Sequence, residues 1–199
     1  MTYQVWDNER VERFIKAYGT PFNPSLNQKR RMRMASKLIS GKSVLDVGCG
    51  MGHLLPWIKD KINFYVGVDS SEEMLRKARE FFHNKSLGIT YGFTKGDVYD
   101  LSGFDVYDSV VAVSLLIHLP DVERAIREMW NHAKKELIFS VQLHNVSRQR
   151  RVPYKNGYLI INWHTETEIL NHITKLQDIA DFDLYHNVGK NWFVKVMRN

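Results

Sequence analysis

The segment from residue 43 to residue 53 constrains the fold more than any other part of the chain. It reads SVLDVGCGMGH, an apolar stretch that runs into three glycines at alternate positions. Glycines allow a tight turn and let a ligand lie against the backbone, because no Cβ stands in the way. Pro56 follows at a place where the first turn of a helix tolerates a residue without an N–H. The segment therefore predicts a strand, a ligand-binding turn and a helix.

The pattern around this turn is typical of alternating strands and helices. Short apolar runs predict strands at 43–47, 64–68, 88–91, 104–113 and 136–141. Amphipathic segments predict helices over 71–82, where Ser70 and Glu73 have the spacing of a capping box, and over 120–133. Such alternation builds a mostly parallel sheet with helices on its faces.

Both ends of the chain add elements to this core. Two helices are expected in the first 42 residues, one over 8–18 and one from about residue 25. A late helix is expected over 166–176. Two apolar runs at 182–185 and 192–197 flank a turn-forming stretch and predict a terminal antiparallel hairpin.

Composition excludes several classes of protein. The single cysteine, Cys49, excludes an internal disulfide, a cysteine-built zinc site and an iron–sulfur cluster held by several thiolates, and we expect no metal site. The first residues lack the apolar core of a signal peptide, and the longest apolar stretch, 110–117, is about half a membrane span. We therefore expect a cytoplasmic protein without a membrane segment.

Acidic residues follow the predicted strands in a characteristic order. Asp46 stands two residues before the first glycine, Asp69 ends the second strand, and Asp97 precedes Val98 after the third. This order and spacing, over roughly residues 38–142, resemble the Rossmann-like (class I) S-adenosylmethionine-dependent methyltransferases, in particular the broad kind that acts on small molecules.

The resemblance implies S-adenosylmethionine as the cofactor and a three-layer α/β sandwich. Its sheet would have seven strands, mostly parallel, with the last strand antiparallel. The resemblance also implies that Asp46 binds the amino group of the cofactor, Asp69 the ribose hydroxyls and Asp97 the adenine amino group. The other cofactor-binding residues that it implies are Gly48, Cys49, Gly50, Gly52, Ser70, Met74, Val98, Val113 and Ser114. For Met74, a core position is an equally good interpretation.

The length of 199 residues with 44% apolar residues favours a single domain. We expect residues 1–42 to form a helical extension or lid and residues 43–142 to form the cofactor-binding core. Residues 143–199 would supply an insertion on the substrate side, a helix and the terminal hairpin.

His118 follows the fourth strand, at the carboxyl end of the sheet where ligands bind in open α/β folds. A histidine there is a candidate general base that takes a proton from the methyl acceptor. The alternative is a loop histidine packed near the cofactor without a catalytic role, because alignment of the reacting groups can promote methyl transfer without a base.

Aromatic residues and arginines predict the acceptor pocket. Trp6 and Tyr18 come from the first 42 residues, and His144, Arg148 and Arg151 come from a polar insertion. Rings with arginines suit a small acceptor that is aromatic or carries a carboxylate or phosphate, methylated at oxygen or nitrogen. They suit stacked RNA bases as well.

The sequence leaves two other functions as alternatives and disfavours a third. The first 42 residues carry nine Lys or Arg against three acids, which would suit a transferase acting on RNA or a protein. A non-catalytic, cofactor-binding partner subunit would keep the same fold. A dehydrogenase is disfavoured because a dinucleotide turn would place glycine or alanine where His53 stands. The sequence does not predict an oligomeric state.

Overall fold

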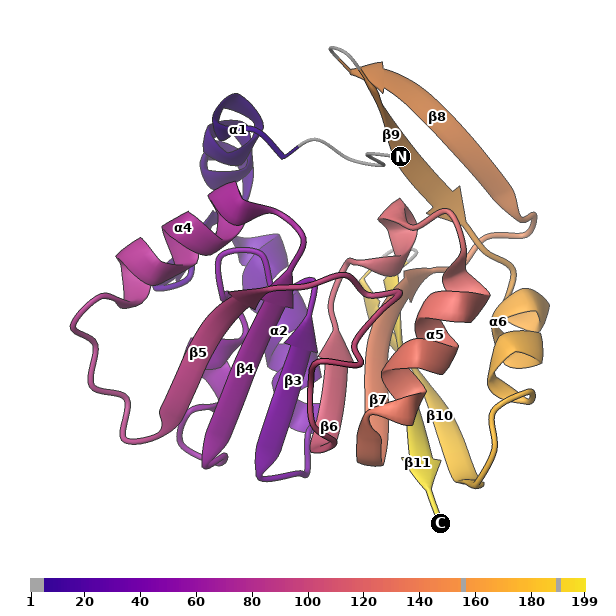
Figure 1. Ribbon diagram of the computed structural model, residues 1–199. Helices are drawn as coiled ribbons and strands as arrows, with labels where there is room; N and C mark the ends of the chain where they lie inside the picture. The colour runs from indigo at the N-terminus through magenta and orange to yellow at the C-terminus, as the bar shows by residue number, and fades with distance from the viewer. Residues whose placement is uncertain (1–5, 155–156, 189–190) are drawn as a thin grey trace.

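One seven-stranded sheet forms the centre of the molecule (Figure 1). The computed structural model describes residues 6–154, 157–188 and 191–199. The strands lie in the order β10-β11-β7-β6-β3-β4-β5. Their bounds are Ser43–Val47 for β3, Phe64–Asp69 for β4, Thr90–Lys95 for β5, Tyr107–Ala112 for β6, Ala133–Gln142 for β7, Ile179–Val188 for β10 and Asn191–Arg198 for β11.

Strands β7, β6, β3, β4 and β5 are parallel, whereas β11 is antiparallel to both β7 and β10. Strands β10 and β11 therefore form a hairpin at one edge of the sheet, with β11 next to β7. The expected mostly parallel sheet with an antiparallel last strand is confirmed. Residues 189 and 190, between β10 and β11 in the chain, lie outside the described residues.

Helices cover both faces of the sheet and complete the three layers. Helices α2 (Leu26–Leu38), α3 (Leu55–Ile58) and α4 (Glu72–Phe82) pack on one face, and α5 (Val122–Asn131) and α6 (Glu166–Ile173) pack on the other. Each face has its own apolar core, because the strands present apolar side chains on both sides. In Figure 1, α5 and α6 lie in front of the sheet and α2 lies behind it.

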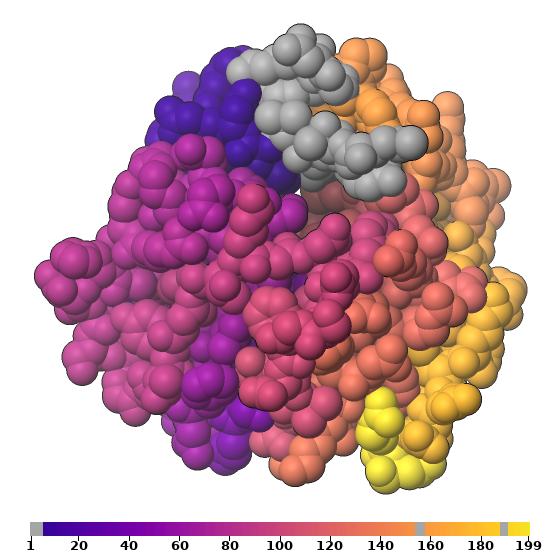
Figure 2. Space-filling view, viewed as in Figure 1, coloured from indigo at the N-terminus to yellow at the C-terminus, as the bar shows by residue number. Residues whose placement is uncertain are grey.

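The remaining elements gather at the carboxyl ends of the parallel strands. Helix α1 (Asn8–Tyr18) lies against α4, and the short 3₁₀ helix η1 (Leu116–His118) follows β6. Strands β8 (Arg148–Tyr154) and β9 (Gly157–Trp163) pair as a separate antiparallel ribbon, and β1 (Gly19–Thr20) pairs with β2 (Asn23–Pro24). The space-filling view shows α1, in indigo, and the ribbon, in orange, on opposite sides of the same end of the molecule (Figure 2).

Helix starts follow the capping residues of the sequence, with one shift. Ser25 caps α2 by accepting a hydrogen bond from Gln28 N, and Thr165 caps α6 in the same way. The expected Ser70 and Glu73 box on α4 is wrong by one residue. Ser71 is the cap, because its extended backbone brings its hydroxyl within 3.2 Å of Met74 N.

Strand boundaries were harder to predict at the edge of the sheet. Strand β5 runs from Thr90 to Lys95 rather than over 88–91, and β6 begins at Tyr107 rather than at residue 104. Strand β5 is an edge strand whose side chains are half-buried or exposed, so its sequence lacks the apolar run of a buried strand. The β8–β9 ribbon was not predicted either, because β8 is rich in arginine.

A buried glutamate joins several elements at the end of the sheet opposite the glycine turn. Glu136 on β7 is only 2% exposed and accepts hydrogen bonds from Ser40 N, from the Ser109 hydroxyl and from Gly41 N. Lys195 on β11 lies 2.6 Å from the carboxylate. Burial alone would raise the pKa of Glu136, but Lys195 and Ser109 outweigh burial and hold the pKa below its ordinary value.

We expect Glu136→Gln to lower the free energy of unfolding by roughly 3 kcal/mol, because Lys195 would lose the buried carboxylate that balances its charge. Urea unfolding measures the change. Glu166→Gln, at an exposed position on α6, is the matched control and should cost less than about 1 kcal/mol. Equal, small effects of both substitutions would show that the buried network contributes little to stability.

Candidate active site

A cavity of about 670 Å³ opens at the carboxyl ends of the parallel strands. Its walls come from the ends of β3, β4 and β6, from η1, and from the sides of α1 and α2 that face the sheet. Most of the residues singled out from the sequence line it. They are Trp6, Tyr18, Asp46, Gly48, Cys49, Gly50, Asp69, Ser70, Met74, Asp97, Val98, Val113, Ser114 and His118.

The glycine turn after β3 presents its backbone to this cavity. Gly48, Gly50 and Gly52 all have positive φ angles, of 72°, 54° and 80°. A Cβ on Gly50 would meet nothing closer than Met74 Sδ at 4.0 Å, so the backbone here borders open space. A Cβ on Gly52 would lie 2.8 Å from the Phe93 ring. Gly52 packs against this ring and is not among the described residues that line the cavity, and its place among the cofactor-binding residues stays a prediction.

Two carboxylates, the buried Asp46 and the half-buried Asp69, stand beside the turn. Asp46 is 3% exposed and accepts a 2.7 Å hydrogen bond from the Tyr65 hydroxyl. Burial raises the pKa of Asp46 to about 7, although the Tyr65 hydrogen bond opposes this effect. Asp69 accepts hydrogen bonds from Gly50 N at 2.8 Å and Ser71 N at 2.9 Å, and burial raises its pKa as well. Within the described part of the chain neither carboxylate has an ion pair, so this wall suits a cationic ligand.

The neighbouring residues complete this half of the cavity. Asp97 is exposed and accepts a hydrogen bond from Tyr99 N, whereas Val98 is buried. Met74 lines the cavity and is also a buried member of an apolar cluster, so its core position is shown and its contact with a cofactor stays a prediction. Burial and the two carboxylates raise the pKa of the Cys49 thiol, which keeps it protonated and a poor nucleophile.

Ser114 bends the chain where β6 ends. Its φ of 61° lies in the left-handed region, which is uncommon for a residue with a Cβ. The bend is held by a 2.6 Å hydrogen bond that Ser114 N donates to the Ser140 hydroxyl on β7. It directs the following segment, which includes η1 and His118, along the cavity.

His118 is oriented by the β8–β9 ribbon. Its Nδ1 lies 3.1 Å from the Ile160 carbonyl oxygen on β9. Because a carbonyl only accepts, Nδ1 carries the hydrogen and Nε2 keeps a lone pair in the neutral ring. Burial lowers the pKa of His118, and the charge of Arg10 lowers it further against the Ile160 hydrogen bond. At neutral pH the ring is therefore uncharged, with its basic nitrogen unprotonated.

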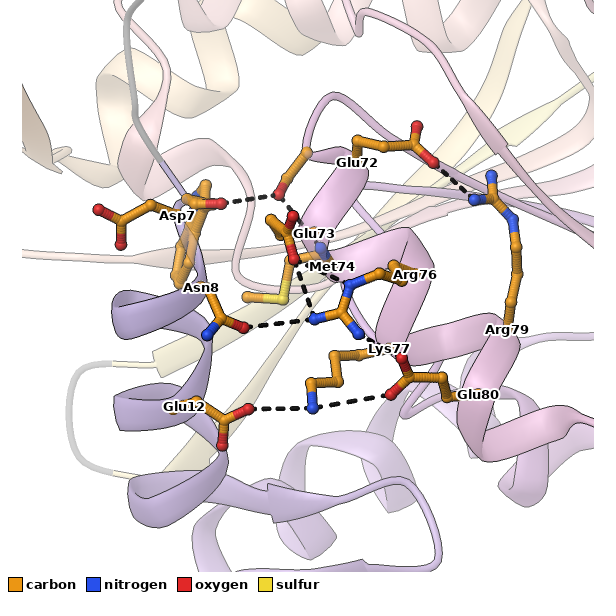
Figure 3. A network of polar contacts seen from close by, with 12 residues as sticks. Asp7, Asn8, Glu12, Glu72, Glu73, Met74, Arg76, Lys77, Arg79 and Glu80 are labelled. Atoms are coloured by element: carbon orange, nitrogen blue, oxygen red, sulfur yellow. Dashed lines mark hydrogen bonds and ion pairs between the residues drawn. The ribbon is translucent and has the colours of Figure 1, made fainter.

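Helix α1 is attached to α4 by polar contacts (Figure 3). Lys77 pairs with Glu12 at 3.0 Å, and Arg76 donates to Asn8 at 3.3 Å. Beneath these contacts Val11 is fully buried in a small apolar cluster with Met51 and Met74. This attachment holds the aromatic side chains of α1 over the glycine turn.

Sequence reasoning missed many residues of the cavity wall, including Gln28, Arg31 and His53. Gln28 and Arg31 from α2 line it, as does His53, whose Nε2 donates a 3.0 Å hydrogen bond to the Gly19 carbonyl oxygen. Burial lowers the pKa of His53 to about 4, so this ring is neutral. The available signal was the helical spacing of Gln28, Arg31 and Met32, which places one face of a basic segment inward.

Three residues expected in the acceptor pocket lie beside aromatic rings of the β8–β9 ribbon. His144, Arg148 and Arg151 are not among the described residues that line the cavity, and their part in an acceptor pocket stays a prediction. Arg148 Cζ lies 5.7 Å from the centre of the Trp163 ring, and the His144 ring lies 5.6 Å from the same ring. Arg151 stacks over Tyr158. The pairing of β8 with β9 brings the two arginines next to these rings.

The described residues offer neither a metal-binding cluster nor a membrane-spanning helix. His, Cys, Asp and Glu side chains form no group of three or more that could hold a metal ion there. None of the helices in the described part of the chain has the length and apolar character that crossing a membrane requires.

Residues 44–136 match the family described as "Methyltransferase domain". This match coincides with the strands and the glycine turn that build the cavity. The region that builds the cavity is therefore similar to methyltransferase domains. Its similarity is spread over several known methyltransferases.

A ubiquinone biosynthesis O-methyltransferase from Coxiella burnetii is 33% identical over 138 residues, which are 64% of this chain and 58% of that protein. A phosphatidylethanolamine N-methyltransferase from Cereibacter sphaeroides is 32% identical over 119 residues, 59% of this chain and 58% of that protein. The magnesium protoporphyrin IX methyltransferase of Synechocystis PCC 6803, solved with bound S-adenosylmethionine, has the same fold. Its TM-score is 0.63 at 21% identity, covering 99% of this chain and 88% of that one.

The matches span between 33% and 58% of the length of the first curated relatives. Because the matches cover only part of these proteins, the acceptors named for them are properties of each relative.

The raised pKa of Asp46 predicts a pH dependence of stability. In the folded chain this carboxyl keeps its proton up to about pH 7, whereas the unfolded chain releases it near the ordinary value of 3.8. Its stabilising contribution is therefore complete below pH 3.8 and is lost as the pH rises towards 7. An asparagine at this position has no proton to release, so Asp46→Asn lacks this loss. The unfolding free energy of the variant minus that of wild type should therefore increase by at least about 1 kcal/mol between pH 5 and pH 7.5.

Urea unfolding at several pH values measures this difference. Because both proteins share all other titrating groups, subtraction isolates Asp46. A difference between the two proteins that stays constant with pH would contradict the burial of an uncompensated carboxyl at this position.

Proposed function

We propose that this protein transfers a methyl group from S-adenosylmethionine to an oxygen or nitrogen of a small molecule. The observation that carries the proposal is the open backbone at Gly50 beside two carboxylates, one buried and one half-buried, without ion pairs in the described chain. An adjoining half of the same cavity leads to His118. The cofactor supplies a methyl group on a positively charged sulfur.

The residues around the glycine turn fit this cofactor by charge and by shape. Asp46 would hold its amino group, because a buried carboxylate favours a cation. Asp69 would accept the ribose hydroxyls while Gly50 N and Ser71 N keep its carboxylate in place. Asp97 would face the adenine amino group, beside Val98. Gly48, Cys49, Gly50, Ser70, Met74, Val113 and Ser114 would form the remaining contacts.

The acceptor would occupy the half of the cavity under α1 and α2. Trp6 and Tyr18 line this half and offer flat apolar surfaces. The names of two relatives support a small acceptor, since one is an O-methyltransferase of ubiquinone biosynthesis and the other an N-methyltransferase of phosphatidylethanolamine. Because one is named for oxygen and the other for nitrogen, the acceptor atom stays open between the two.

His118 would take the proton that the acceptor releases. Its Nδ1 is committed to Ile160, so Nε2 is the nitrogen that can accept a proton. The nearby charge of Arg10 favours the neutral ring that a base requires. The remainder of the rate enhancement would come from holding acceptor and methyl group in line within a closed pocket.

Transfer of a labelled methyl group tests the proposal. The protein is incubated with labelled S-adenosylmethionine and cell extract, and the products are separated into small molecules, RNA and protein. We expect label in the small-molecule fraction. Asp69→Ala should abolish both the label and the binding of S-adenosylhomocysteine measured by calorimetry, whereas Asp60→Ala, at an exposed site, should change neither.

Other distributions of label would replace the proposal. Label that is sensitive to RNase would favour an RNA acceptor, and label in protein would favour a protein acceptor. S-adenosylhomocysteine binding without any label would favour a non-catalytic partner subunit. Normal binding by Asp69→Ala would show that the role assigned to Asp69 is wrong.

The role of His118 predicts a change in rate without a change in cofactor binding. We expect His118→Gln to lower kcat by about 100-fold, the usual scale for loss of a general base. In wild type, kcat should rise with pH through a pKa below 6.5, because the ring must be neutral to accept the proton. This step should disappear in the variant. An unchanged pH profile would identify His118 as a packing residue.

A further inference from the structure

We propose that Arg31, with Gln28 and Tyr18, forms an oxyanion-binding subsite, and that the methyl acceptor carries a carboxylate or phosphate group that binds there. This inference rests on the proposed function and specifies the acceptor of the same cavity. Its three residues come from α1 and α2, which the cofactor-binding turn does not include.

The three side chains meet within one part of the cavity wall. Gln28 and Arg31 are three residues apart on α2, so both lie on the same side of the helix. Arg31 Nη1 lies 3.5 Å from Gln28 Oε1, and Arg31 Cζ lies 5.8 Å from the centre of the Tyr18 ring. Gln28 is only 7% exposed although it is polar. The amide and the ring together hold the guanidinium towards the cavity.

The charge of Arg31 has no countercharge in the described structure. Among the described residues no acidic side chain pairs with it, although it is partly buried. Arg13 on α1 and Lys77 on α4 do have acidic partners, Glu9 and Glu12. The other basic side chains of α2 resemble Arg31 in lacking one among the described residues, but Lys29, Arg30 and Arg33 are exposed. A partly buried guanidinium without an acid is costly to keep, and it forms strong two-point hydrogen bonds with carboxylate or phosphate. The missing partner is therefore an oxyanion.

The position of Arg31 separates this subsite from the cofactor end. The acids Asp46 and Asp69 lie at the ends of β3 and β4. Helix α2 instead packs near β7, β10 and β11, and Gln142 and Asn191 line the adjoining wall. One cavity thus has a negative end, suited to a cationic cofactor, and a positive end under α2. An acceptor with an oxyanion would bind in one orientation, with its other end towards His118.

Three small aromatic probes test this subsite: benzoate, phenyl phosphate and benzamide. Their binding to the full chain saturated with S-adenosylhomocysteine is measured by ligand-observed NMR titration. Benzamide is the neutral control, and the two anions distinguish a carboxylate from a phosphate site. We expect at least one anion to bind more tightly than benzamide.

A matched pair of variants then locates the binding. Arg31→Gln should weaken the preferred anion by about tenfold or more and leave benzamide unchanged, because it removes the charge-assisted hydrogen bonds. Arg30→Gln makes the same change of charge on an exposed neighbour and should leave anion binding within about twofold. An equal loss in both variants, or no preference of wild type for an anion, would overturn the proposal.

Binding of S-adenosylhomocysteine distinguishes a failure of the proposed function from a failure of the oxyanion subsite. Calorimetry with S-adenosylhomocysteine should give the same affinity for wild type, Arg31→Gln and Arg30→Gln. If wild type does not bind S-adenosylhomocysteine, the proposed function fails. If it binds but shows no preference for anions, the methyltransferase proposal stands and only the oxyanion subsite is removed.

Discussion

The placement of two carboxylates, one buried and one half-buried, at the carboxyl ends of β3 and β4 is the constraint on which the rest of the site depends. Asp46 and Asp69 are held by a tyrosine hydroxyl and by backbone N–H groups. The Asp69 contact requires Gly50 N to point back at β4, which the left-handed glycine turn makes possible. Gly48 N and Cys49 N both donate to the Val68 carbonyl oxygen, so the turn is bound to the neighbouring strand. A sharp turn, a buried charge and an open backbone thus arise together.

The charges of the cavity follow from which helices cover it. Strand ends supply acids on one side, and α2 supplies Arg31 on the other. Helix α1 closes the space between them because Val11 packs beside Met51 and Met74 on top of the turn. A ligand pair in which one partner is cationic and the other anionic would match this arrangement. The proposed methyl transfer to an acidic small molecule is a reaction of that kind.

Stability and function are concentrated at opposite ends of the sheet. At one end Glu136 draws together β7, β11 and the segment before β3 through hydrogen bonds and Lys195. At the other end Asp46 is buried at a cost, with a pKa raised to about 7. The well-satisfied end helps the sheet to tolerate the unfavourable burial at the ligand-binding end.

The sequence by itself determined the core of this protein. Apolar periodicity located β3, β4 and β7, a capping box located α6, and the glycine turn with its acids indicated the ligand site. These features are local, because a few neighbouring residues are enough to favour a strand, a cap or a tight turn. Even so, the edge strand β5 and the cap of α4 were misplaced, since short polar patterns allow more than one boundary.

Only the tertiary structure decided which side chains meet in the cavity. His118 is oriented by Ile160 through a hydrogen bond between residues 42 positions apart, and the ribbon that carries Ile160 was not predicted. The same ribbon keeps Arg148 and Arg151 on its own aromatic residues, whereas α2 directs Arg31 inward. All these arginines look alike in the sequence. Their different surroundings depend on long-range packing, which local periodicity does not encode.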